Sequence, residues 1–352
     1  MKILYVDISL RGHRVMYLKA LAEKNAGCVA LLPEESSEIP CKQVLMTSGY
    51  DKKRNLNNYI RWISEIKKIV KSQSIEAVHF LCGDALYKFF GVNLGTIPVK
   101  TIVTYHHIQF SKVRNMSLKR IFTKTDMGVV HTDHLKESIN RVGIDNVIKI
   151  EYPVFGDSTE IDASYAKKKI GLPCDRPCIV VLGGTQRYKG LDILLQALKK
   201  VRYPFYLYIT GLERDFTLDY IKQETVGYAD SVGYCMKRLS DEEYKLALSA
   251  TDYIVLPYRF EFDGASGPMI EGVWNRKYII GAEHGSMGSI IKKYNLGRTF
   301  KTEDANDLAR VLNDVFAKKE TWSYEAEKFR TEITVEHFLE SYSNLYANIG
   351  EK

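Results

Sequence analysis

The chain lacks several features that would place it in other classes of protein. None of its apolar runs reaches transmembrane length, and its first residues lack the longer apolar stretch and the cleavage site of a secretory signal. Its 6 cysteines are scattered, with no C-x-x-C pair and no histidine at zinc-finger spacing. Free thiols fit this pattern better than a metal or disulfide framework. We therefore expect a cytoplasmic protein.

Internal repeats and low-complexity segments are also absent, and no nucleic-acid recognition motif or aromatic stacking platform accompanies the positive charges. Nucleic acid is therefore not an expected partner. The composition, 45% hydrophobic and 26% charged, is ordinary for a globular protein. A length of 352 residues is comfortable for two domains, each with its own core.

Positive charge is concentrated in the first part of the chain. Residues 1–155 contain 23 Lys and Arg against 14 Asp and Glu, a net charge of +9, whereas the remainder contains 27 against 29, a net charge of −2. The excess gathers at 52–54, 61–71 and 112–124. These cations could contact anionic lipid head groups or lipid diphosphates, at about 1 kcal/mol per charge. The alternative is that they form solvated helix faces.

Both parts of the chain alternate short apolar runs with longer amphipathic segments, which is typical of βα units and parallel sheets. In the first part we expect strands at 3–6, 28–32, 77–81, 100–105 and 127–130, and helices at 14–26, 55–72, 84–92 and 133–142. In the second part we expect strands at 178–182, 205–210, 231–234, 253–256 and 278–281, and helices at 191–201, 241–250, 268–275, 290–294 and 305–317. Proline and glycine between positions 152 and 177 indicate a linker. The sequence thus predicts an α/β protein with two doubly wound, Rossmann-like parallel-sheet domains, 1–155 and 156–329.

The segment 257–272 carries the strongest indication of function. It follows an apolar strand, passes through a small-residue loop and enters a helix at Pro268, a residue suited to the first helical turn. Such a helix N-terminus presents free backbone N–H groups to an anion, here those of Ala265, Ser266 and Gly267. Two carboxylates, Asp263 and Glu271, bracket the loop. Together they indicate a ligand with both phosphate and hydroxyl groups, such as a nucleotide sugar.

Each carboxylate has a functional and a local interpretation. Glu271 could accept hydrogen bonds from the vicinal hydroxyls of a ribose, or it could only complement the helix dipole. Asp263 could bind a sugar hydroxyl or stabilise positive charge near an anomeric carbon, or it could make a local turn hydrogen bond.

Other loops that follow predicted strands hold further candidates. Gly184, Arg187 and Lys189 lie in the glycine-bounded turn 182–191, where Arg and Lys could bind a diphosphate; the alternative is a turn with two solvated cations. In the first domain, His106 ends a strand and could hydrogen-bond the transferred group, although a single histidine is more often structural. Gly12 and Tyr234 are weaker candidates for residues of the same site.

Gly12 precedes a helix and would let a ligand approach the backbone closely. Tyr234 could stack on a nucleotide base, or it could belong to a surface loop. Because ligands bind beyond the carboxyl ends of parallel strands, two such domains facing across a cleft would bring these loops together.

With these motifs in order, nearly the whole chain resembles the retaining "group 1" glycosyltransferases of the two-domain GT-B fold. Gly267-Pro268-Met-Ile-Glu271 is similar to the end of the acidic-x7-acidic signature of that family, with Asp263 as its first acid. The turn Thr185-Gln-Arg-Tyr-Lys-Gly190 resembles the phosphate-binding "R…KG" turn, and Thr104-Tyr-His106 the "T-x-H" motif. Residues 152–155 resemble the entry to the hinge, residues 283–288 the glycine turn after the last main strand, and residues 329–346 the terminal helices that return to the first domain.

The resemblance implies a metal-independent enzyme that uses a nucleotide-diphosphate sugar as co-substrate, needs no other cofactor and keeps the anomeric configuration. The first domain, completed by 330–352, would be the acceptor side, and 156–329 would bind the donor. Arg187, Lys189 and the loop amides would stabilise the leaving diphosphate, Asp263 and His106 would contact the sugar, and Glu271 the ribose. The chain has Asp263 where the family usually has Glu, and Glu261 stands two residues earlier.

The acceptor would be a glycan or a lipid-linked glycan, in surface polysaccharide assembly on the inner face of a membrane. Two alternatives remain at this point. One is a sugar-nucleotide epimerase or hydrolase on the same fold, and the other is a non-catalytic nucleotide-sugar or glycan-binding protein.

Overall fold

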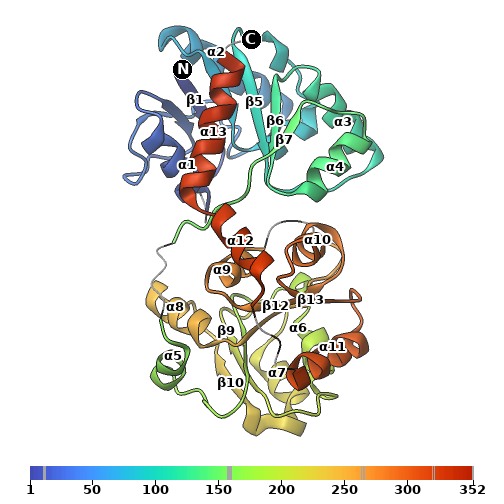
Figure 1. Ribbon diagram of the computed structural model, residues 1–352. Coiled ribbons are helices and arrows are strands. Elements are labelled where there is room, and N and C mark those ends of the chain that lie inside the picture. The colour runs from blue at the N-terminus through green and yellow to red at the C-terminus, as the bar shows by residue number, and fades with distance from the viewer. Residues whose placement is uncertain are drawn as a thin grey trace. The chain divides into compact units, whose positions relative to one another are not determined.

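The computed structural model describes residues 1–10, 13–156, 161–262, 264, 266–318, 320 and 322–350. The chain forms two compact units (Figure 1). The first consists of Met1–Phe155 with Thr334–Lys352, and the second of Gly156–Ile333. None of the described helices is both long enough and apolar enough to cross a lipid bilayer.

The first unit is built on a parallel sheet of seven strands in the order β3-β2-β1-β4-β5-β6-β7. Its strands are β1 (Ile3–Val6), β2 (Val29–Leu32), β3 (Lys42–Leu45), β4 (Ala77–Phe80), β5 (Lys100–Tyr105), β6 (Met127–Val130) and β7 (Val147–Lys149). The strand order reverses between β1 and β4, as in a doubly wound fold. Helices on both faces bury the central strands, so every residue of β1 and β4 is buried; β1 is a continuous apolar run, whereas β4 includes His79.

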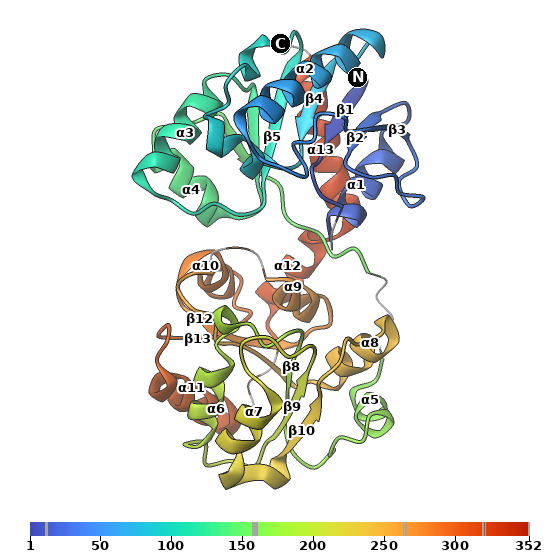
Figure 2. The same ribbon diagram turned by 180° about the vertical axis from the view of Figure 1, so that it is seen from behind.

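Successive residues of β1 lie on opposite faces of the sheet and so belong to two different hydrophobic cores. Leu4 and Val6 pack with α2 (Leu56–Ser72), α3 (Lys112–Phe122) and α4 (Asp133–Arg141), which cover one face of the sheet (Figure 2). Ile3 and Tyr5 pack on the other face, with α1 (His13–Lys24) and α13 (Val335–Gly350) (Figure 1). The 3₁₀ segments η1 (Gly83–Phe89) and η2 (Leu94–Thr96) complete the unit. The C-terminal helix thus returns to the first sheet, as predicted.

The second unit contains a parallel sheet of six strands in the order β10-β9-β8-β11-β12-β13. Its strands are β8 (Cys178–Val181), β9 (Tyr206–Thr210), β10 (Val232–Cys235), β11 (Tyr253–Leu256), β12 (Tyr278–Ala282) and β13 (Gly297–Phe300). Its helices are α5 (Ala163–Lys169), α6 (Leu191–Leu198), α7 (Leu218–Glu224), α8 (Asp241–Ala250), α9 (Gly267–Trp274), α10 (Gly285–Lys293), α11 (Ala305–Lys318) and α12 (Tyr324–Glu332), with the 3₁₀ segments η3 (Arg187–Lys189) and η4 (Val226–Ser231). Two Rossmann-like parallel sheets confirm the predicted fold class.

The sequence missed the strands β3, β7 and β13, and all three lie at sheet edges. An edge strand is less covered than a central one, so it does not need a continuous apolar run; β3, with the sequence KQVL, has no buried residue. The sequence also missed α3, α5 and α7. Helices α3 and α5 are rich in Lys or Arg, and α5 lies within the segment that was expected to be a linker. Residues 83–89 form a 3₁₀ segment where an α-helix was expected.

Candidate active site

The turn after β8 is held in place by close backbone packing. Gly190 has φ +68°, and a Cβ atom there would lie 1.9 Å from the carbonyl oxygen of Pro257. A Cβ atom on Gly211, after β9, would lie 2.2 Å from the carbonyl oxygen of Gly183. Only glycine permits these approaches. The turn is therefore fixed against the loops that follow β9 and β11.

Lys189 ends this turn and is partly buried. Its Nζ lies 3.4 Å from the carbonyl oxygen of Leu182, and burial lowers the pKa of its ammonium group. Of the residues that the structure describes, none places a carboxylate within ion-pair distance of Nζ. A partly buried cation without a counter-ion is costly unless a ligand supplies the charge. Lys189 and Gly184 line the same small pocket after β8.

Arg187 has an exposed side chain, whereas its backbone is anchored. Its N–H donates to Oδ2 of Asp215 at 2.7 Å, and its carbonyl oxygen accepts from Nε of Arg259 at 3.2 Å. The guanidinium of Arg259 is itself paired with Asp192 at 2.5 Å. The protein therefore fixes the Arg187 backbone, and its role in binding phosphate stays a prediction.

Helix α9 begins at the carboxyl edge of the second sheet. Ser266 is its N-cap, and its Oγ accepts a hydrogen bond from the backbone N–H of Met269 at 3.4 Å. Gly267 follows as the first helical residue. Glu271, one turn further, accepts a short hydrogen bond from the hydroxyl of Tyr244 on α8. Burial raises the pKa of Glu271, and the Tyr244 hydroxyl opposes that rise.

Three predicted site residues, Gly12, Asp263 and Ala265, lie outside the described residues. The residue before Asp263 is nevertheless well held. The ring of Phe262 stacks on Tyr188, with centroids 5.7 Å apart and planes 7° from parallel. Its carbonyl oxygen accepts a hydrogen bond from Nε2 of His284 at 3.0 Å. Phe262, immediately before the predicted catalytic acid Asp263, is therefore held by both its ring and its backbone carbonyl.

In the first unit, His106 directly follows β5. Its Nε2 donates to the carbonyl oxygen of Leu81 at 3.2 Å, and its ring meets Tyr17 edge-on at 5.2 Å. The hydroxyl of Tyr17 bonds to that of Tyr342 on α13, which in turn lies 3.1 Å from Oγ1 of Thr104. Helix α13 thus packs against β5, the strand that His106 directly follows.

Tyr234 lies in β10, and its hydroxyl is 3.0 Å from Oγ1 of Thr225. Its predicted stacking on a base stays a prediction. The sequence offered no signal for the site neighbours Tyr244, Tyr188 and His284, because each acts through a contact with a residue distant in the chain. Among the described residues, no group of three or more His, Cys, Asp or Glu is arranged to hold a metal ion.

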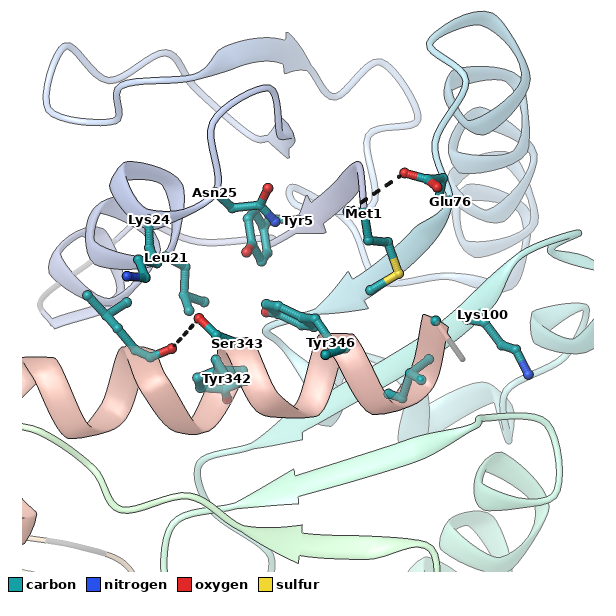
Figure 3. Close-up of a pocket in the computed structure, with 14 residues that line it drawn as sticks. Met1, Tyr5, Leu21, Lys24, Asn25, Glu76, Lys100, Tyr342, Ser343 and Tyr346 are labelled. Carbon is teal, nitrogen blue, oxygen red and sulfur yellow. Dashed lines mark hydrogen bonds and ion pairs between the residues drawn. The ribbon is translucent and has the colours of Figure 1, made fainter. Parts of the chain in front are cut away.

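A cavity of about 580 Å³ lies in the first unit, at the amino ends of the strands (Figure 3). It is lined by Tyr5, by Lys100 at the start of β5 and by α13 residues that include Tyr346. His106 follows the opposite end of β5. This cavity is therefore separate from the predicted site.

Two Rossmann-like parallel sheets, with an anchored glycine turn and a helix N-terminus at the carboxyl edge of the second, form the architecture of the GT-B fold. Residues 163–330 match the model of the family described as "Glycosyl transferases group 1". The match lies within the second unit and supports the resemblance to group 1 glycosyltransferases seen in the sequence.

Two curated relatives resemble about half of the chain. The O-antigen chain mannosyltransferase C of Escherichia coli is 24% identical over 176 residues, which cover 48% of this chain and 46% of the relative. A UDP-N-acetylglucosamine–N-acetylmuramyl-(pentapeptide) pyrophosphoryl-undecaprenol N-acetylglucosamine transferase of Acetivibrio thermocellus is 23% identical over 196 residues, which cover 51% and 49%. The matched regions span about half the length of these relatives.

Solved structures match over the full length. HepE (Alr3699) of Anabaena, in complex with UDP, has a TM-score of 0.78 at 12% identity and covers 99% of this chain and 100% of its own. A glycosyltransferase from Rickettsia africae has a TM-score of 0.76 at 17% identity, with 99% and 98% covered. At these identities the likeness establishes the GT-B fold.

Proposed function

We propose that the protein is a retaining glycosyltransferase, which moves a sugar from a nucleotide-diphosphate sugar to a glycan or lipid-linked acceptor in surface polysaccharide assembly. The observation that carries the proposal is Lys189, a partly buried ammonium group in an anchored turn, for which no described residue supplies a counter-ion. The family match and the curated relatives, one of them an O-antigen mannosyltransferase, support the same class of reaction.

The proposed chemistry follows from charge. Cleavage of the sugar–phosphate bond places negative charge on the diphosphate. Lys189, Arg187 and the backbone amides at the start of α9 would stabilise that charge as fixed groups, without reorganisation. Asp263 would contact the sugar as positive charge develops at the anomeric carbon. The amide of Ala265 is assigned to the same group of donors as those of Ser266 and Gly267.

The remaining roles belong to binding. Glu271 would accept the ribose hydroxyls, Tyr234 would contact the base, and Gly12 and His106 would contribute from the first unit to binding of the donor. The departing phosphate can accept the proton of the acceptor in a front-face reaction, so no separate base is proposed. We propose no metal and no cofactor beyond the nucleotide sugar.

Peripheral contact with an anionic membrane surface is part of the proposal, on the inner face of a membrane. The best candidate is α3, where Val113 and Met116 are 63% and 64% exposed. They share one helix face with Lys112, Lys119 and Arg120, which are also exposed. Apolar side chains surrounded by cations are suited to an anionic lipid surface.

A thermal-shift panel of UDP, GDP, ADP and their sugars tests the proposed binding. A ligand that binds only the folded state raises its stability. We expect at least one nucleotide to raise the melting temperature, and Lys189→Ala and Glu271→Gln to reduce the shift. If no nucleotide or nucleotide sugar shifts the melting temperature, the proposed function is contradicted.

A further inference from the structure

Glu271 is linked to a neighbouring helix by one side-chain contact. The hydroxyl of Tyr244, in the first half of α8, donates a hydrogen bond to Oε2 of Glu271 on α9. These residues are 27 positions apart in the chain, so the contact depends on how the two helices pack. Both helices follow strands of the second sheet, β10 and β11, from the edge where ligands bind in such folds.

The start of α8 is held by side-chain hydrogen bonds, which restrain the position of the Tyr244 hydroxyl. Ser240 caps the helix, and a capping box joins it to Glu243 through hydrogen bonds in both directions. Glu243 also pairs with Lys237 at 2.6 Å. Tyr244 follows directly, so its ring leaves the helix from an anchored turn.

The Glu271 carboxylate depends on this hydroxyl because it has little other support. Of the residues that the structure describes, none provides a cation within ion-pair distance of it. Among the described residues, the titratable groups that face it are Tyr244 from α8 and Tyr258 from the loop after β11. The hydroxyl of Tyr258 accepts a hydrogen bond from Oγ of Ser266 at 3.3 Å. A carboxylate removed from water needs hydrogen bonds to stay ionised.

We propose that Tyr244 is a positioning residue for nucleotide binding: its hydroxyl holds Oε2 of Glu271 and leaves Oε1 for the ribose hydroxyls. This inference rests on the proposed ribose role of Glu271. Tyr244 belongs to none of the sequence motifs described above. A carboxylate held at one oxygen has less rotational freedom to lose when the nucleotide binds, which favours affinity.

The proposal has a pH signature. Glu271 accepts ribose hydroxyls best when it is ionised, and burial raises its pKa. The protein should therefore bind nucleotide with its full affinity when the pH is above the pKa of Glu271. The affinity should fall as the pH drops through that pKa. Without the Tyr244 hydroxyl, the pKa rises further, so the loss of affinity should begin at higher pH.

The test compares Tyr244→Phe, Glu271→Gln and the double variant by calorimetric titration with UDP, GDP and ADP from about pH 5 to pH 8. Tyr244→Phe should weaken binding about tenfold, the effect of losing a hydrogen bond to a charged group. It should also move the acid midpoint upward. In the Glu271→Gln background the same change should have almost no effect, because the two residues act as a unit.

The matched control is Tyr228→Phe, which removes a hydroxyl that donates to the carbonyl oxygen of Leu195 in the same unit at 3.1 Å. Its nucleotide affinity and acid midpoint should remain those of the wild type. Thermal unfolding verifies that each variant folds. A carbon-13 NMR titration of the glutamate carboxyl groups gives the pKa of Glu271 without any ligand. The Glu271 signal is assigned because it is missing from the spectrum of Glu271→Gln.

The outcomes separate the two claims. If Glu271→Gln weakens binding while Tyr244→Phe leaves the affinity, the midpoint and the carboxyl pKa unchanged, only the role of Tyr244 is overturned. If Glu271→Gln also leaves the affinity unchanged, the ribose assignment fails and the positioning role fails with it. An equal effect of Tyr244→Phe in the wild-type and Glu271→Gln backgrounds would show that Tyr244 acts only on folding or packing.

Discussion

Nζ of Lys189 lies 3.4 Å from the carbonyl oxygen of Leu182, the residue that follows β8. The carbonyl orients the ammonium group without neutralising it. The glycine turn holds Lys189 there, because Gly190 packs against the backbone of Pro257. The contact shows how the fold can position a cation for a ligand that brings negative charge.

Replacing Lys189 tests its role in turnover. Lys189→Ala should lower kcat about a hundredfold or more, because it removes a fixed charge that opposes the developing charge of the leaving group. Lys199→Ala is the matched control, since Lys199 pairs with Glu224 at 2.7 Å outside the turn. Steady-state kinetics with the active donor measure both variants. Near-wild-type kcat in Lys189→Ala would remove this residue from the mechanism.

Gly190 should not tolerate a side chain. Gly190→Ala would place Cβ against the carbonyl oxygen of Pro257 and adopt φ +68°, so it should destabilise the second unit by at least about 2 kcal/mol. Gly227→Ala is the control, because a Cβ atom there meets nothing within 4 Å. Thermal and urea unfolding measure the difference. Equal stability of the two variants would argue against the packing of this turn.

His79 should make the first unit sensitive to acid. It is fully buried between Thr104 and Tyr346, at 2.7 and 2.8 Å, and burial lowers its pKa to about 3. The unfolded chain would bind a proton near pH 6.5, so the stability should fall as the pH drops below that value, by up to about 1.4 kcal/mol per pH unit.

In His79→Gln this part of the pH dependence should disappear, even if the variant is less stable at neutral pH. Urea unfolding at a series of pH values between about 4 and 7 gives the slope for each protein. An unchanged slope in the variant would mean that His79 is not held neutral by the fold.

The exposed face of α3 should bind anionic lipid. Vesicles with phosphatidylglycerol should retain the protein more than vesicles of phosphatidylcholine alone, and salt should weaken the binding. Val113→Gln with Met116→Gln should reduce the binding, and Lys119→Gln with Arg120→Gln should reduce it about fivefold per charge.

Lys199→Gln with Lys200→Gln, on the second unit, is the control for loss of charge alone. Co-sedimentation with vesicles measures all the variants. If the control loses as much binding as the α3 variants, the contact is a general effect of net charge and α3 is not the membrane surface.

The central strands and the resemblance to group 1 glycosyltransferases could be predicted from the sequence because they depend on local pattern. Ile3–Val6 and Tyr253–Leu256 are continuous apolar runs, typical of strands buried on both faces of a sheet, and Gly267 to Glu271 is a contiguous motif. The edge strand Lys42–Leu45 has no such pattern, because one of its sides lacks a neighbouring strand.

The supporting residues of the site could not be predicted, because they act through tertiary contacts. Tyr244 on α8 contacts Glu271 on α9, and His284, which follows β12, donates a hydrogen bond to the carbonyl of Phe262 in the loop after β11. Neither pair has a fixed spacing that sequence alone could recognise. Motifs thus indicate which residues contact a ligand, whereas packing determines which residues hold them.

Release of nucleotide from UDP- and GDP-sugars, measured with and without glycan or lipid-linked acceptors, distinguishes a glycosyltransferase from a hydrolase and from a binding protein. We expect that one donor is cleaved, that an acceptor accelerates the release, and that the product keeps the anomeric configuration, as read by NMR. Tight nucleotide binding with no release from any donor and acceptor combination would contradict catalysis and favour a binding protein on this fold. Release at the same rate without an acceptor would contradict transfer and favour a hydrolase.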